Sequence, residues 1–269
     1  MIIGIDIGST ITKVVSVENK SVVHKIKTKA LDVVTSATGA FGKIVVENGI
    51  KISDIERIMI TGAGATKLQS DLFGIPTKKV NEITAIGIGG MFLSKSDNIV
   101  ITNIGTGTAI VLAEKDKISH LGGSGVGGGT ILGLSKMLLR TSNFNDIMKL
   151  AEAGDPKKID LLIGDIMDSD ISFLSKDSTV SNFGKTPDNP QSEDIAIGIV
   201  SMVYQVIGML SVFAARSRNI DRIIVTGNGS DNPIGKKILQ AISRLHSVNF
   251  EYPDFADYTT AIGAGLASV

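Results

Sequence analysis

The chain has 269 residues, enough for one large domain or two modest domains with their own cores. Its 27 basic and 27 acidic residues balance, so nothing indicates a polyanionic partner such as nucleic acid. It contains no cysteine, which excludes disulfides, cysteine-ligated zinc, iron–sulfur clusters and thiol catalysis. The opening MIIGIDIGST lacks the basic start of a signal peptide, and we expect a cytoplasmic protein.

Hydrophobic periodicity predicts alternating strands and helices along the whole chain. We expect strands at 2–7, 13–17, 22–27, 57–61 and 79–81, then at 98–103, 108–113, 117–120 and 222–226. We expect helices at 30–48, 65–73, 82–94, 128–140, 143–153, 157–166, 193–217, 233–245 and 258–267. The polar, proline-containing stretch 181–194 is predicted to be a loop.

Residues 195–215 carry no charged side chain and are long enough to span a bilayer. The stretch contains four polar residues, and no second segment of this kind accompanies it. We therefore predict a helix buried in the core or at a subunit interface, and no membrane association.

The chain also repeats itself. The motif IDIGST at 5–10 returns in outline as TNIGTGT at 102–108, and DIERIMITGAGA at 54–65 returns as NIDRIIVTGNGS at 219–230. Two copies in this order indicate two similar α/β halves in tandem. Four glycine- and hydroxyl-rich turns, paired by duplication, point to a nucleoside triphosphate held between the halves.

Each of these turns also has a plainer interpretation. Asp6 follows a strand and could hold hydrated Mg²⁺, but aspartate is also an ordinary turn residue. The segment HLGGSGVGGGTILGL at 120–134 puts a glycine run before a helix, which suits an anion site or a flexible surface loop. Glu82 stands where an apolar strand meets a helix, where a carboxylate could act as a base or merely cap the helix.

Taken together, these motifs resemble the type II pantothenate kinases, in the actin, Hsp70 and sugar-kinase superfamily. The motifs GIDIGSTITK, ITGAGA, VNEITA, NIGTGT, GGSGVGGGTILGL, SNFG, VTGNGS and AIGAG occur in that family's order. The resemblance implies an α/β fold of duplicated actin-like ATPase (ribonuclease H-like) halves with a nucleotide cleft between them. It implies an N-terminal half at 1–95, onto which the terminal helix 258–269 packs back, and a C-terminal half at 96–257.

The resemblance also implies site residues. Those for ATP and phosphate are Asp6, Ile7, Gly8, Ser9, Thr10, Lys13, Gly105, Thr106, Gly107, Thr108, Gly127, Gly128, Gly129, Thr130, Phe144, Asn228, Gly229 and Ser230. Asp6 would hold Mg²⁺ through water, and Glu82 would be the catalytic base beside the substrate. His120 stands where the family has an arginine that contacts the substrate, and histidine lacks that residue's bidentate fork.

The implied activity is ATP-dependent phosphorylation of pantothenate in coenzyme A biosynthesis, by a homodimer. One alternative is a related kinase acting on another primary alcohol, such as a pantetheine-like compound or a sugar. Another is a nucleotide-dependent ATPase switch that is not a kinase. The activators of radical dehydratases bridge their dimer with a cysteine-ligated cluster, which this cysteine-free chain cannot bind.

Overall fold

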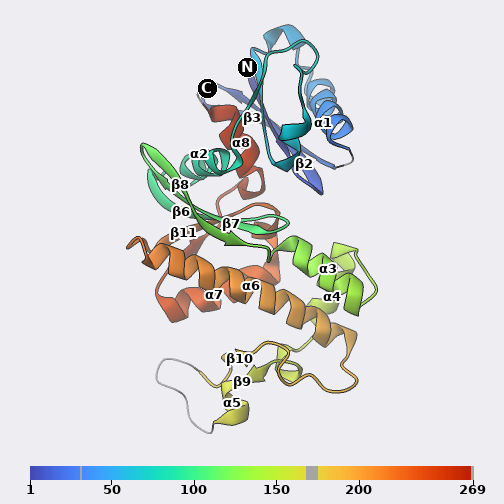
Figure 1. Ribbon diagram of the computed structural model, residues 1–269, viewed down its shortest axis with the longest axis vertical. Helices are drawn as coiled ribbons and strands as arrows, with labels where there is room; N and C mark the ends of the chain where they lie inside the picture. The colour runs from blue at the N-terminus through green and yellow to red at the C-terminus, as the bar shows by residue number, and fades with distance from the viewer. Residues whose placement is uncertain (31, 168–174, 268–269) are drawn as a thin grey trace.

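Residues 1–30, 32–167 and 175–267 are described by a computed structural model, and they form two α/β halves, each around one five-stranded sheet (Figure 1). The first sheet has the order β3-β2-β1-β4-β5 and the second the order β8-β7-β6-β11-β12. In both, three antiparallel strands are followed by two parallel ones. This shared connectivity confirms the duplication predicted from the motifs.

The first half contains β1 (Ile2–Ile7), β2 (Ile11–Glu18), β3 (Ser21–Lys29), α1 (Val33–Glu47), η1 (Ile52–Asp54), β4 (Arg57–Thr61), η2 (Ala63–Lys67), β5 (Thr77–Lys79) and α2 (Glu82–Ser94). The second sheet is formed by β6 (Asn98–Ile104), β7 (Thr108–Glu114), β8 (Lys117–Ser124), β11 (Arg222–Thr226) and β12 (Asn249–Glu251). Isoleucine and valine dominate the central strands because both faces of each sheet are covered by other elements.

The remaining elements surround the second sheet or follow it. They are α3 (Gly128–Leu138), α4 (Phe144–Ala153), η3 (Pro156–Lys158), β9 (Leu161–Leu162), α5 (Ile163–Ile166), β10 (Thr179–Ser181), α6 (Ser192–Arg216), η4 (Asn228–Asp231), α7 (Pro233–His246), η5 (Ala256–Tyr258) and α8 (Thr259–Leu266). The short pair β9–β10 and α5 lie on the far side of α6 from the second sheet (Figure 1).

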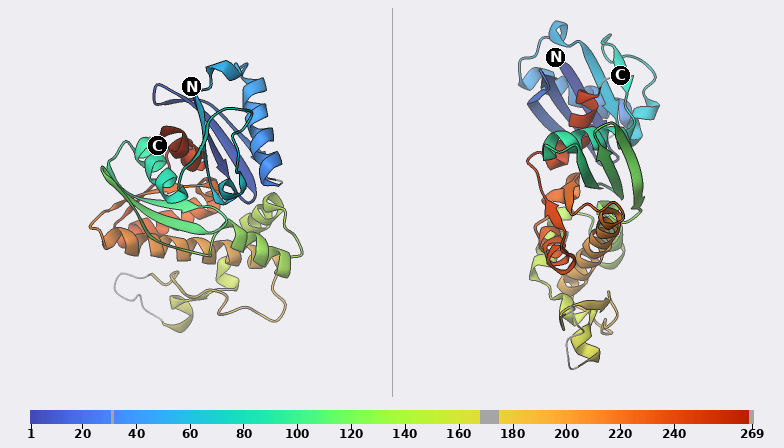
Figure 2. Two further views of the ribbon diagram at one scale, coloured as in Figure 1. Left: turned by 45° about the horizontal axis from the view of Figure 1, so that its top comes forward. Right: turned by 90° about the vertical axis from the view of Figure 1, so that its left-hand side faces the viewer.

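Two helices cross between the halves. α2 packs on β6, β7 and β8 of the second sheet, whereas α8 packs on β1, β2 and β4 of the first. The two helices lie side by side between the sheets (Figure 2). Glycines allow this approach, because a Cβ at Gly263 would collide with the Ala85 carbonyl and one at Gly89 with the Thr259 carbonyl. The halves are therefore joined by a backbone-to-backbone helix contact.

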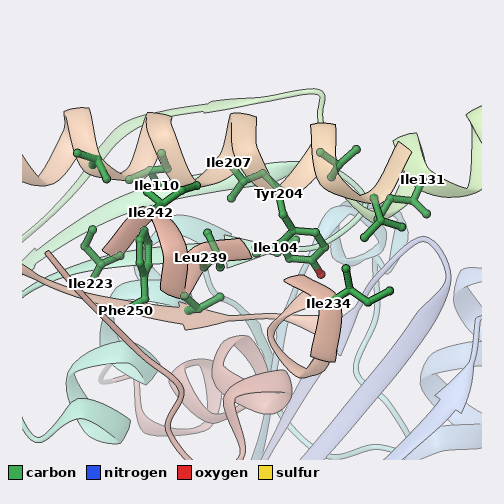
Figure 3. Close-up of a cluster of buried hydrophobic side chains, with 14 of the residues drawn as sticks. Ile104, Ile110, Ile131, Tyr204, Ile207, Ile223, Ile234, Leu239, Ile242 and Phe250 are labelled. Carbon is green, nitrogen blue, oxygen red and sulfur yellow. The ribbon is translucent and has the colours of Figure 1, made fainter. Parts of the chain in front are cut away.

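The largest core cluster lies between the second sheet and the helices α6 and α7 (Figure 3). α6 is the one described helix that is long and apolar enough to cross a membrane, with a mean hydropathy of 2.1 in its most apolar window. Inside the protein, 67% of that window is buried against other elements. This burial agrees with the predicted core helix and gives the apolar sequence a packing role.

Two predicted helices are wrong. Residues 65–73 form only the end of η2 and an irregular segment, because Phe73 and Gly74 both have positive φ angles of 54° and 74°. Leu68 and Leu72 are buried there at a spacing that imitates a helical stripe. Residues 157–166 do not form one helix but are divided among η3, β9 and α5. At the start of α5, the Asp165 side chain accepts a hydrogen bond from the Leu162 N–H at 2.8 Å.

Smaller differences concern strands. The strand expected at 79–81 lies at Thr77–Lys79, and the short strands β9, β10 and β12 were not predicted. Each has two or three residues, too few for a period of two to be detected. Of the terminal segment assigned to the first half, residues 268–269 lie outside the described residues.

Candidate active site

A cavity of about 340 Å³, here called the loop cavity, lies where the first strands of the two sheets end. The first half contributes Asp6 from β1, Ser9 from the β1–β2 turn and Lys13 from β2. The second half contributes Asn103 from β6 and the β6–β7 turn at 105–107. The duplication thus brings equivalent turns of the two halves face to face.

Asp6 and Lys13 oppose each other in the β1–β2 register and both line the loop cavity. Burial raises the pKa of Asp6 to about 6, an effect that Lys13 counteracts and Glu82 reinforces. Lys13 is only 4% exposed, and burial lowers the pKa of its ammonium group while Asp6 raises it. Two poorly hydrated charges of opposite sign suit a ligand that carries both signs, such as a triphosphate with a divalent cation.

The β6–β7 turn is closed by the Gly105 N–H, which donates to the Gly107 carbonyl at 2.8 Å. Asn103 occupies the place of Asp6 in the second half, and its Oδ1 accepts from the Thr226 hydroxyl at 3.0 Å. The second half therefore offers neutral polar groups to the loop cavity, and the carboxylate comes from the first half alone.

The start of α3 packs directly on this turn. The Gly128 N–H donates to the Gly105 carbonyl and the Gly129 N–H to the Thr106 carbonyl, each at 2.9 Å. Phosphate binding by residues 127–130 stays a prediction, but the amides of Gly128 and Gly129 are engaged inside the protein. They fix the conformation of the turn.

The other residues of this helix start are also engaged. The Gly127 N–H donates to the Thr130 hydroxyl at 3.1 Å, and Gly127 is buried. A Cβ at Gly127 would lie 2.8 Å from the Gly107 Cα, and one at Gly129 would lie 2.6 Å from the Thr106 side chain. The glycine run is therefore explained by the close approach of helix and turn.

A second cavity, here called the apolar cavity, has a volume of about 350 Å³ and shares Thr10, Thr106 and Asn228 with the loop cavity. Its apolar walls are formed by Ile104, Ile131, Leu132, Phe144, Val203 and Tyr204. A mostly apolar pocket with a few polar groups at its edge suits a flat base. The two cavities together can receive a nucleoside and its phosphates.

Two side-chain hydroxyl groups stabilise the η4 turn through hydrogen bonds to backbone carbonyls. The Tyr204 hydroxyl, on buried α6, donates to the Gly229 carbonyl at 2.8 Å. The Ser230 hydroxyl donates to the Gly227 carbonyl at 2.8 Å, and Ser230 is only 1% exposed. Asn228 and Gly229 consequently face the apolar cavity, whereas Ser230 stabilises the turn.

Most site residues predicted from the sequence line one of the two cavities. The loop cavity is lined by Asp6, Gly8, Ser9, Thr10, Lys13, Glu82, Gly105, Thr106, Gly107 and Thr108. The apolar cavity is lined by Gly128, Gly129, Phe144, Asn228 and Gly229. Ile7, Gly127, Thr130, Ser230 and His120 line neither. Four lining residues were not predicted from the sequence: Ile131, Leu132, Val203 and Tyr204. Of these, only the tyrosine hydroxyl in an apolar helix gives a signal in the sequence.

Glu82 is the first residue of α2 and lines the loop cavity. The helix cap is the preceding residue, Asn81, whose Oδ1 accepts from the N–H groups of Ile83 at 2.9 Å and Thr84 at 3.3 Å. Among the described residues, no hydrogen bond engages the Glu82 carboxylate, and partial burial raises its pKa. Such a carboxylate is available to accept a proton from a ligand.

His120 is exposed on β8, opposite Val111 in the β7–β8 register. Val111 belongs to the core cluster beneath α2, so His120 lies on the α2 side of the sheet. This is also the side from which Glu82 faces the loop cavity. A contact between His120 and a substrate stays a prediction.

The donor set at Asp6 fits Mg²⁺ bound through water. Among residues 1–30, 32–167 and 175–267, no three histidine, aspartate or glutamate side chains gather in a metal-binding group. Mg²⁺ usually retains several waters and binds through one or two carboxylates together with substrate phosphates. Asp6 beside the Ser9 and Thr10 turn therefore suits a cation that arrives with the nucleotide.

Structural comparison places the chain among known ATPase folds. It matches the activator of 2-hydroxyisocaproyl-CoA dehydratase from Clostridium difficile with bound ADPNP, with a TM-score of 0.65 and 20% identity over 98% of this chain and 92% of that one. It matches a ROK family glucokinase from Streptomyces griseus in complex with glucose and AMPPNP, with a TM-score of 0.60 and 14% identity over 98% and 97%. At these identities the likeness concerns the fold, and it confirms the predicted actin-like architecture.

Sequence comparison is more specific. A type II pantothenate kinase from Bacillus anthracis is 36% identical over 247 residues, covering 86% of this chain and 84% of the relative. One from Oceanobacillus iheyensis is 29% identical over 220 residues, covering 78% and 81%. The family model described as Fumble matches residues 98–266. The chain therefore belongs to the Fumble family, together with the type II pantothenate kinases.

Proposed function

We propose that the protein transfers the γ-phosphate of ATP to the primary hydroxyl of pantothenate, giving 4′-phosphopantothenate for coenzyme A biosynthesis. The observation that carries this proposal is that the carboxylate of Glu82 lines the same cavity as both glycine-rich turns. It does not cap α2, and no described residue forms a hydrogen bond with it. Phosphoryl transfer to an alcohol needs this combination of a positioned phosphate and a proton acceptor.

Each group has a distinct task in this proposal. The turns at Ser9 and Thr106 hold the phosphates from opposite sides, and Lys13 neutralises part of their charge. Glu82 orients the acceptor hydroxyl and takes its proton as the new phosphate ester forms. Asp6 would hold Mg²⁺ through water, and the ion would supply further neutralisation of the phosphate charge. The apolar cavity receives the adenine.

The relatives' name supports pantothenate over the alternative acceptors, a pantetheine-like compound or a sugar. A nucleotide switch without kinase activity is less favoured, because the relatives that match the chain over most of its length are named as kinases. We include in the proposal a cytoplasmic location and a homodimer, which the resemblance to the family implies.

The decisive experiment measures ADP release with ATP and Mg²⁺ in the presence of pantothenate, pantetheine, pantoate or several sugars, with mass spectrometry of the products. The proposal expects ADP release that depends on pantothenate and a product heavier by one phosphate. ADP release that is equal with and without any acceptor would identify an ATPase and contradict the proposal.

A further inference from the structure

An ion pair at the rim of the apolar cavity connects the two halves. The Lys27 ammonium, on β3 of the first half, lies 3.3 Å from Oδ2 of Asp257, on η5 of the second. Both residues line the apolar cavity, and both also line a second cavity, here called the outer cavity. The pair is therefore shared by the walls of these two cavities.

Asp257 has capacity for another hydrogen bond. Its side chain is 14% exposed, and among the described residues only Lys27 donates to it, through Oδ2. Lys13, which lines the loop cavity, is close enough for Asp257 to affect the pKa of its ammonium. Asp257 thus lines the apolar cavity within electrostatic reach of a residue of the loop cavity, and no described residue donates a hydrogen bond to its Oδ1.

A nucleoside presents one group with matching chemistry at this place. The ribose lies between the phosphates and the base, and its 2′- and 3′-hydroxyls are hydrogen-bond donors that carboxylates commonly accept. We propose that Asp257 binds the ribose hydroxyls of the nucleotide and that Lys27 is the positioning residue that holds the carboxylate in the rim. This inference rests on the proposed use of ATP and adds a determinant of nucleotide specificity.

Neighbouring residues provide matched controls. Lys25 lies on the same face of β3, two residues from Lys27, and its ammonium lies 3.6 Å from the centre of the Phe255 ring. It contacts the same segment of the second half but does not line the apolar cavity. Asp254 is likewise an exposed acid of that segment that lines only the outer cavity. Substitution of either residue changes the charge without touching the ribose.

The test measures dissociation constants of ATP, 2′-deoxy-ATP and 3′-deoxy-ATP by calorimetry with Mg²⁺ and without acceptor. We expect the unsubstituted protein to bind ATP about 10- to 100-fold more tightly than at least one deoxynucleotide, as for loss of a hydrogen bond to a charged group. Asp257→Ala should lose this preference because its affinity for ATP falls to that for the deoxynucleotide. Lys27→Met should reduce the preference and Lys27→Arg restore it, whereas Lys25→Met and Asp254→Asn should retain it.

The contrary results are equally clear. Equal affinity of the unsubstituted protein for all three nucleotides, or an equal loss for all three in Asp257→Ala, would overturn the ribose contact. Melting curves without nucleotide show whether each variant is folded, and Asp257→Asn, which keeps size and a neutral acceptor, should have an intermediate preference. If ATP binds with this preference but pantothenate is not phosphorylated, the proposed acceptor fails and the ribose contact stands.

Discussion

The hydroxyl oxygens of Ser9 and Thr106 lie 2.8 Å apart, although the residues are separated by 97 positions in the sequence. This hydrogen bond closes the cleft at the two glycine-rich turns, while the α2–α8 contact joins the halves through glycine backbones at Gly89 and Gly263. Of these two contacts, the one between Ser9 and Thr106 is a single exposed hydrogen bond, whereas the α2–α8 contact is a closely packed helix crossing. A bound triphosphate can therefore separate the turns while the helix contact persists.

The first prediction concerns the proton acceptor. Glu82→Gln keeps the size of the side chain but removes its ability to take a proton. We expect turnover with pantothenate to fall by about 10²- to 10⁴-fold with little change in the KM for ATP, because in the proposed function Glu82 acts on the acceptor hydroxyl and not on the nucleotide. Steady-state kinetics with both substrates varied checks this expectation.

Asn81 provides the control for a purely structural role. Asn81→Ala removes the cap of α2 and should destabilise the protein by about 1 kcal/mol, whereas Glu82→Gln should leave the melting temperature nearly unchanged. A Glu82→Gln protein that melts like Asn81→Ala and keeps full turnover would show that Glu82 serves the helix only.

A second prediction is the pH dependence of kcat/KM for pantothenate. Burial raises the pKa of Glu82, so the carboxylate becomes protonated at a higher pH than the ordinary glutamate value of about 4.3. The base is active when ionised, so activity is present above the folded-state pKa and is lost as the pH falls through it. Asp6, with a pKa of about 6, titrates nearby. Comparing the pH profiles of the unsubstituted protein and of Glu82→Gln assigns the fall in activity. The part of the acid-side fall that is absent in Glu82→Gln is caused by protonation of Glu82.

Much of the fold follows from local pattern. Long β-branched strands and the apolar helix α6 have periods that a sequence shows directly, and the two pairs of motifs reveal the duplication. The segment at 65–73 could not be predicted in the same way, because Leu68 and Leu72 are buried at a helical spacing in a chain that turns at Phe73. There, tertiary packing overrides the local pattern.

Some residues of the candidate site could likewise be predicted from the sequence, whereas others could not. Ser9 and Thr106 are adjacent to glycines that follow strand ends, and Asp6 lies two residues before Gly8, so their meeting across the cleft was predictable from the duplication. Tyr204 and Asp257 reach the apolar cavity from elements without a motif, and only the folded chain brings them there. The bonding of the α3 amides to the neighbouring turn likewise depends on the distance between two segments, which no motif encodes.

The third prediction concerns the cost of keeping Asp6 charged. Its folded-state pKa of about 6 exceeds the ordinary aspartate value of about 3.9, so the folded protein binds the proton more tightly than the unfolded chain. Asp6 therefore destabilises the nucleotide-free protein above pH 6, and this effect fades as the pH falls toward 4. Asp6→Asn should raise the melting temperature at pH 7.5, with a smaller gain at pH 5.

The same variant should lose function. We expect Asp6→Asn to abolish most of the Mg²⁺-dependent part of the stabilisation by ATP, since the neutral amide is a weaker partner for a hydrated cation. Thermal denaturation with ATP, with and without Mg²⁺, measures both effects. An unchanged Mg²⁺ effect in Asp6→Asn would mean that another group holds the cation.

The fourth prediction distinguishes Gly127, the N-cap residue of α3, from Gly133 inside that helix. A Cβ at Gly127 would lie 2.7 Å from the Thr106 carbonyl oxygen, whereas nothing lies within 4 Å of one at Gly133. Gly127→Ala should destabilise the protein by about 1–3 kcal/mol and raise the KM for ATP, because the turn at 105–107 must move. Gly133→Ala should stabilise it by up to about 1 kcal/mol and leave the KM unchanged. Equal behaviour of the two variants in urea denaturation would contradict the packing explanation.

The last prediction concerns His120, which stands where the family resemblance leads us to expect an arginine. A guanidinium group is longer than imidazole and binds a carboxylate through two parallel hydrogen bonds, so His120→Arg should lower the KM for pantothenate by up to about tenfold. The turnover number and the KM for ATP should stay the same, because the added contact is to the acceptor. Pantetheine, which has no carboxylate, should gain nothing.

Ser119 offers the matched control for this change. It neighbours His120 on β8 but pairs with Leu112, which belongs to the core cluster on the α6 side of the sheet, so Ser119→Arg adds the same charge facing away from α2. If position 120 faces the acceptor, only His120→Arg improves the use of pantothenate relative to pantetheine. Equal effects of the two arginines would point to a general electrostatic attraction. No effect of either would mean that the pantothenate carboxylate is bound elsewhere, by a basic residue outside β8.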